Sequence, residues 1–148
     1  MKIVANCSIN APLFEVFNTF SDLNSLAENV DAIKHIEVLT PGDIGVGTKF
    51  KETRMMSGKE SIDEMEVTEF SSPHYFKEEA FSGGMHYVNE WRFSQVEEEV
   101  KVEITFTTTA SSIGAKLLNI MFFFMKGSMT KAFLADMADL KKVLEANH

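Results

Sequence analysis

The chain has 148 residues and a formal net charge of −8 at neutral pH. Nucleic-acid binding requires clustered lysines and arginines, which this sequence lacks, so we expect no nucleic-acid partner. The same acidity disfavours binding to anionic membrane surfaces.

The single cysteine, Cys7, excludes an intrachain disulfide and favours a reducing compartment. The first six residues lack the apolar core of a secretory signal. The most apolar run, residues 120–125, is far shorter than the roughly 20 residues that cross a bilayer. We therefore expect a cytoplasmic protein of bacterial type with no stable membrane insertion.

Hydrophobic periodicity predicts one strand, two short helices, about six further strands and one long helix. Asn10 and Pro12 are typical of a helix start, and the Ser57-Gly58-Lys59 stretch is typical of a hairpin turn. Residues 100–107 alternate most regularly between apolar and polar side chains, as a half-buried strand does. The expected elements are a strand at 2–9, helices at 14–20 and 23–30, strands at 35–40, 48–56, 60–70, 74–81, 85–96 and 100–107, and a helix from 111 or 112 to 145.

The long helix carries one apolar stripe at spacings of three and four. Gly127-Ser128 interrupts it and is expected to bend it there. Since the stripe must be buried, we predict a single α+β domain, 1–148, in which this helix packs over the concave face of a curved antiparallel sheet of about seven strands. The stripe consists of Leu118, Phe122, Met125, Met129, Phe133, Met137, Leu140 and Leu144, widened by Leu117, Met121 and Phe124.

Four stretches resemble a known superfamily over essentially the whole chain. They are Ile9-Asn10-Ala11-Pro12 followed by Phe14-Glu15-Val16-Phe17, then residues 45–50, 91–93 and 134–142. The chain resembles the START/Bet v 1-like (SRPBCC) superfamily, specifically its polyketide cyclase/dehydrase and lipid-transport group. The resemblance implies the helix-grip fold and a cavity for ligands such as lipids, sterols, hormones or polyketides. No catalytic motif is shared across the group, so a cavity is implied more firmly than chemistry.

The strand expected at 85–96 supplies candidate ligand contacts. We place the face with Met85, Tyr87, Asn89 and Trp91 inward because it is the more apolar one. The Tyr87 hydroxyl and the Asn89 amide would then need partners, since burying an unpaired polar group costs roughly 1–3 kcal/mol. Either a bound ligand or a neighbouring strand can supply them.

The apolar stripe supplies the opposite wall. The chain has 13 phenylalanines and nine methionines, and methionine adapts to irregular apolar surfaces. We expect Met121, Phe122, Met125, Met129 and Phe133 to face the sheet and line a cavity, although a solid core remains the alternative.

Charged residues on two strands are further candidates. Phe50, Glu52 and Arg54 share a face, and an inward Glu52 and Arg54 would orient the polar head group of a ligand. Glu64 and Glu66 on the next strand would have the same role if they point inward. The alternative is a solvated face with charge pairs across strands, because a register slip of one residue inverts every face.

No metal or cofactor is expected. The four histidines show no metal-ligand spacing, and residues 42–49 are glycine-rich but lack the ending of a phosphate-binding loop. Cys7 has no evident base partner and is interpreted as structural.

Three functions follow from these observations. The preferred hypothesis is a carrier that binds a hydrophobic small molecule, lipid-, sterol- or polyketide-like, between sheet and helix. The first alternative is a polyketide cyclase or dehydratase that uses Glu52, Arg54, Tyr87 and Asn89. The second is a protein-interaction module of the chaperone-activator type, which an exposed apolar patch would favour. The sequence leaves the ligand and the oligomeric state open.

Overall fold

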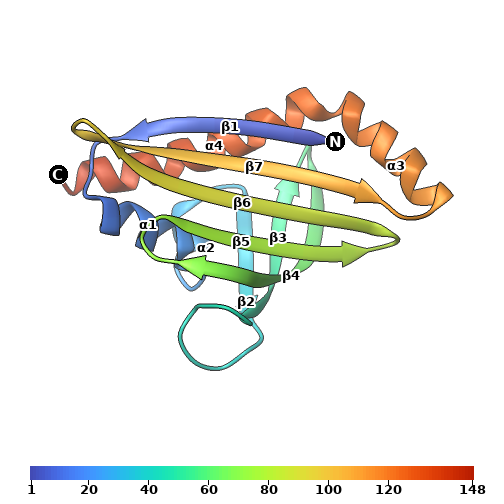
Figure 1. Ribbon diagram of the computed structural model, residues 1–148, viewed down its shortest axis with the longest axis horizontal. Helices are drawn as coiled ribbons and strands as arrows, with labels where there is room; N and C mark the ends of the chain where they lie inside the picture. Colours follow the sequence, from blue (N-terminus) through green and yellow to red (C-terminus); the bar gives the residue numbers. More distant parts are fainter.

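The computed structural model describes residues 1–148, which form seven strands and four helices (Figure 1). In chain order they are β1 (Lys2–Ile9), α1 (Leu13–Ser21), α2 (Leu26–Asn29), β2 (Ile33–Val38), β3 (Lys49–Met56), β4 (Lys59–Ser71), β5 (Tyr75–Ser82), β6 (Met85–Val96), β7 (Glu99–Ala110), α3 (Ile113–Phe124) and α4 (Lys126–Ala146). None of the helices combines the length and apolar character needed to cross a membrane.

All seven strands belong to one antiparallel sheet in the order β1-β7-β6-β5-β4-β3-β2. Consecutive strands from β2 to β7 pair as neighbours, and β1 pairs with β7 at the far edge. Register shifts interrupt the β2–β3 ladder between Ile33 and His35 and the β4–β5 ladder between Val67 and Glu69. Such irregularities bend strands, and the sheet curls around α4 (Figure 1).

The core lies between the concave face of this sheet and the helices α1 and α4. Phe17 of α1 is completely buried and makes edge contacts with three aromatic rings. The ring centroids of Phe70, Phe76 and Phe93 lie 5.3, 5.7 and 5.2 Å from that of Phe17. From α4, Met137, Leu140 and Leu144 join the same cluster. This packing closes one end of the space under the sheet, because α1 and the second half of α4 meet there.

The predicted helix-grip architecture is confirmed, with differences at the ends of elements. The second strand occupies 33–38 instead of 35–40. The last strand runs on to Ala110 because residues 108–110 still pair with the start of β6, although the ladder with β1 ends at Thr107.

The predicted single C-terminal helix is in fact two helices, and the break falls at Met125 and not at Gly127-Ser128. The Met125 N–H donates to the carbonyls of the preceding turn, including those of Met121 and Phe122, which ends α3. Gly127 and Ser128 lie in the first turn of α4. The bend lets both helices follow the curved sheet, since one straight helix of that length would leave it (Figure 1).

The start of α3 is fixed against the turn between β5 and β6. The Ser112 side chain accepts a hydrogen bond from the Ala115 N–H at 3.1 Å, which caps the helix. Gly84 has a φ of +80°, and a Cβ atom there would lie 2.7 Å from the Ser112 Oγ. Only glycine therefore allows this close approach.

The outward face of α3 is apolar and exposed. Its side chains are exposed by 52–81%: Ile113, Leu117, Ile120, Met121, Phe123 and Phe124. The prediction that Met121 faces the sheet is therefore wrong, because Ala115 and Phe122 occupy the inner side of this helix. An exposed apolar face is the feature that an interaction module requires, and that hypothesis stays a prediction.

We expect the substitution Phe124→Ser to leave stability nearly unchanged. The Phe124 side chain is 81% exposed at the end of α3, so its removal opens no cavity. The free energy of unfolding should stay within about 0.5 kcal/mol of the wild-type value in urea titrations. A loss above about 2 kcal/mol would mean that this face is covered in solution.

Candidate functional site

A cavity of about 240 Å³ lies between the inner face of the sheet and helix α4. It is surrounded by 22 residues, of which 15 are hydrophobic. The apolar members are Phe20, Leu26, Val30, Ile33, Met56, Met65, Phe76, Ala80, Tyr87, Trp91, Phe106, Phe122, Met129, Phe133 and Leu140. The polar members are Glu52, Arg54, Ser61, Asp63, Glu78, Asn89 and Asp136. Mostly apolar walls with a few convergent polar groups are typical of small-molecule sites.

The structure places most of the predicted site residues around this cavity. Those that line it are Glu52, Arg54, Tyr87, Asn89, Trp91, Phe122, Met129 and Phe133. The face of β6 that was predicted to point inward does point into the cavity. On β3, the face with Glu52 and Arg54 also points inward, a direction that the sequence did not determine. The space between sheet and helix is not filled by side chains.

Four predicted residues do not line the cavity: Phe50, Met85, Met121 and Met125. Phe50 is buried and packs with Leu23 and Val67 in a small separate cluster. Met85 is buried opposite Ala110 at the end of the sheet. Met125 packs beside the buried cluster that includes Met129, whereas Met121 points outward.

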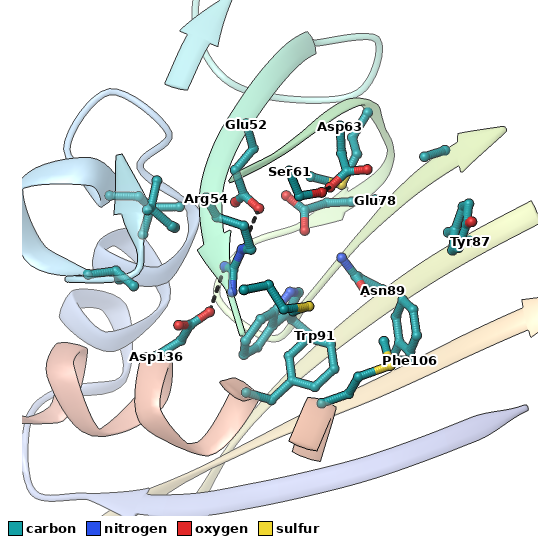
Figure 2. Close-up of a pocket in the computed structure, with 18 of the residues that line it drawn as sticks. Glu52, Arg54, Ser61, Asp63, Glu78, Tyr87, Asn89, Trp91, Phe106 and Asp136 are labelled. Carbon is teal, nitrogen blue, oxygen red and sulfur yellow. Dashed lines mark hydrogen bonds and ion pairs between the residues drawn. The ribbon is translucent and has the colours of Figure 1, made fainter. Parts of the chain in front are cut away.

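Arg54 of β3 bridges two carboxylates at one end of the cavity. Its Nε atom lies 3.0 Å from Oε2 of Glu52, and its Nη2 atom lies 2.7 Å from Oδ2 of Asp136. Figure 2 shows Glu52 on the same strand as Arg54, with Asp136 reaching toward the guanidinium from α4. All three side chains are only 12–13% exposed. This network ties α4 to the sheet and makes one end of an otherwise apolar space polar.

Burial governs the ionisation of this network. Desolvation raises the pKa of Glu52 and that of Asp136, although the charge of Arg54 opposes both shifts. Burial alone would lower the pKa of Arg54, but the charges of Glu52 and Asp136 outweigh burial and raise that pKa above its usual value. The guanidinium is therefore a fixed positive charge whose two close contacts are already made with acids.

Glu78 of β5 is an acid of the cavity wall whose pKa is strongly raised. Its side chain is buried, and burial together with the nearby charge of Glu52 raises its pKa to about 8. The neighbouring polar groups of Asn89 and Trp91 lower that pKa only in part. Glu78 is thus mostly protonated at neutral pH and is able to donate a proton.

The inner face of β4 carries Ser61, Asp63 and Met65. The Ser61 hydroxyl donates to the Asp63 carboxylate at 3.2 Å. Asp63 is exposed as well as part of the lining, so the cavity reaches solvent there. Glu64 and Glu66, which the sequence raised as candidates, do not line the cavity, and Glu66 pairs with Lys49 at 3.8 Å on the surface.

Sequence reasoning missed two of the central acids, Glu78 and Asp136. A signal for Glu78 was present, since it alternates with Phe76 and Ala80 and so shares their inward face. Asp136 follows Phe133 by three residues and precedes Leu140 by four, which places it within the apolar stripe. An acidic residue within an apolar helical stripe indicates either a buried ion-pair partner or a functional site.

No group of three or more histidine, cysteine, aspartate or glutamate side chains is arranged to hold a metal ion. Cys7 lies on β1 away from the cavity lining, and burial raises the pKa of its thiol.

Comparisons with known proteins give one family match and many similar folds. The family described as polyketide cyclase / dehydrase and lipid transport matches residues 1–145. No curated protein matches the chain by sequence. The protein TTHA0849 from Thermus thermophilus is 20% identical, with 99% of each chain covered and a TM-score of 0.79.

Two other solved structures share the fold at lower identity. A START superfamily protein from Mycobacterium smegmatis is 8% identical, with 99% of each chain covered and a TM-score of 0.77. The Zhui aromatase/cyclase from Streptomyces sp. R1128 is 13% identical, with 98% of this chain and 93% of that chain covered, and has a TM-score of 0.77. At these identities the likeness shows the fold alone.

Proposed function

We propose, since the chain belongs to the polyketide cyclase / dehydrase and lipid transport family, that it binds a hydrophobic small molecule in the cavity between the sheet and α4. The observation that carries this proposal is the unfilled space of about 240 Å³ with 15 hydrophobic lining residues. Packed interiors rarely leave such space, because each void forfeits contacts among its walls. The ligand is compact, since typical small-molecule sites begin at roughly 300 Å³.

The two ends of the cavity differ in a way that suits an amphiphile. Phe106, Phe122 and Met129 lie at the apolar end, beside one another in the small cluster under β1 and β7. Glu52, Arg54 and Glu78 lie toward the other end (Figure 2). A ligand with an apolar body and one polar group therefore matches the walls better than a pure hydrocarbon does.

Filling the cavity from the sheet side tests the proposal. Ala80 of β5 lines the cavity, and Ala80→Phe would place an aromatic ring in it while suiting a strand. We expect wild-type protein to bind the neutral dye N-phenyl-1-naphthylamine saturably, and the variant to bind it at least about tenfold more weakly. Fluorescence titration measures both affinities.

The exposed variant Phe124→Ser is the matched control and should bind the dye as wild type does. Native mass spectrometry of gently purified protein would identify a ligand that co-purifies. Unchanged dye affinity in Ala80→Phe, with a folded variant by circular dichroism, would contradict binding in this cavity.

A cyclase or dehydratase activity is the second candidate, and Glu78 is the observation that favours it. A carboxyl with a pKa of about 8 is a competent general acid at neutral pH, and Glu52 and Asp136 lie in the same lining as candidate bases. Dehydration of an aryl β-hydroxyketone to its conjugated enone is a direct assay by absorbance. Turnover that Glu78→Gln removes would support this candidate, and turnover that persists in that variant would contradict the role of Glu78.

A further inference from the structure

Two buried oxygen atoms in the cavity wall have no hydrogen-bond partner. They are Oδ1 of Asn89 and Oδ1 of Asp136, and both residues line the cavity. Asp136 is only 8% exposed, and the Asn89 oxygen is itself inaccessible to solvent. Leaving a buried acceptor unpaired is destabilising, so each atom calls for a donor.

The contacts of both side chains show why these particular atoms are free. Asn89 lies opposite Glu78 in the β5–β6 ladder, and its side-chain oxygen accepts no hydrogen bond. Asp136 uses Oδ2 to accept from Arg54 at 2.7 Å, which leaves its other oxygen. Carbonyl and carboxylate oxygens only accept hydrogen bonds, so the missing partner must be a donor.

The charges of the cavity wall also disfavour a negatively charged ligand. Arg54 is the single cationic side chain in the lining, and its close contacts are with Glu52 and Asp136. Two further acids, Asp63 and Glu78, belong to the same lining. An anionic head group would meet several carboxyl groups and no uncommitted cation, whereas a neutral or cationic donor would not be repelled.

We propose that the ligand of this cavity is an amphiphile whose polar end donates a hydrogen bond and carries no negative charge, an alcohol or an amine. Asn89 accepts its first O–H or N–H group, and Asp136 is the acceptor for a second N–H group where the ligand has one. This inference rests on the proposed binding function and specifies its ligand class. Fatty acids and other carboxylates are excluded as preferred ligands, and so are apolar molecules whose only polar groups are ketones.

Four probes with one chain length test the head group directly. Decan-1-ol, decylamine, decan-2-one and decanoate are nearly equal in size, and each is measured at pH 7 by displacement of N-phenyl-1-naphthylamine. We expect the alcohol and the amine to bind at least about fivefold more tightly than the ketone and the carboxylate, as one satisfied buried acceptor implies. The alcohol and the amine, compared with each other, separate hydrogen bonding from charge attraction.

Two variants test which residue causes the preference for the alcohol over the ketone. Asn89→Leu removes one acceptor at similar volume without touching the Arg54 pairs, and it should bring the alcohol and the ketone to within about twofold of each other. Glu64→Gln is the control, because Glu64 is exposed and lies outside the cavity lining, so its replacement should preserve the alcohol preference.

The outcomes separate this inference from the function on which it rests. Decanoate or decan-2-one binding as tightly as decan-1-ol to the wild-type protein would overturn the donor head group while leaving the cavity as a binding site. Failure of the dye and of all four probes to bind would overturn the binding function itself, and the head-group inference with it.

Discussion

The substitution Arg54→Met is expected to lower the free energy of unfolding by about 3–5 kcal/mol. The guanidinium neutralises two carboxylates, Glu52 and Asp136, that are only 12–13% exposed. Removing one partner of a buried ion pair leaves uncompensated charge in a poorly solvated place, and this is more destabilising than the loss of the attraction itself. Urea titration at pH 7 measures the change.

A triple variant tests whether the unpaired charges of Glu52 and Asp136 cause that loss of stability. Arg54→Met combined with Glu52→Gln and Asp136→Asn contains no charge at these positions, so it should recover most of the lost stability. The single variant Arg92→Met is the surface control, because the Arg92–Glu90 pair lies 3.2 Å apart at a side chain that is 50% exposed. It should cost under about 1 kcal/mol. A triple variant no more stable than Arg54→Met would refute the explanation by charge.

The same network marks the limit of what the sequence predicted. Alternation along one strand identified Tyr87, Asn89 and Trp91 as inward, because a period of two is a local property that needs no partner strand. The pair Arg54–Asp136 joins residues 82 positions apart and depends on how α4 crosses the sheet. No local periodicity contains that information, so the acid on the helix was overlooked.

The misplaced residues near α3 have a different physical cause. The stripe of a helix covers only a limited arc of its surface. Phe122 lies on that arc and lines the cavity, whereas Leu117, Met121 and Phe124, which were predicted to widen the stripe, lie beside it and are exposed. Their apolar character favoured a wider wall, but only one side of α3 is buried.

Glu78 makes the stability of the protein depend on pH in a direction opposite to that of a salt-bridged acid. Its pKa is about 8 in the folded protein, raised by burial and by the charge of Glu52 from the ordinary value of 4.5. The folded state therefore holds a proton that the unfolded chain releases between these two values. Stability from this group is fully present below pH 4.5 and is lost as the pH rises through 8.

We therefore expect Glu78→Gln to gain stability relative to wild type as the pH rises. Glutamine keeps the shape of the protonated acid and cannot ionise, so the advantage of the variant should grow by on the order of 3 kcal/mol between about pH 5 and pH 9. Urea titrations of both proteins across that range measure the difference. Glu64→Gln, on the exposed outer face of β4, is the control and should follow the wild-type profile. Parallel profiles for Glu78→Gln and wild type would show that Glu78 already ionises near its ordinary pKa in the folded protein, and the general-acid role proposed for it would then be untenable at neutral pH.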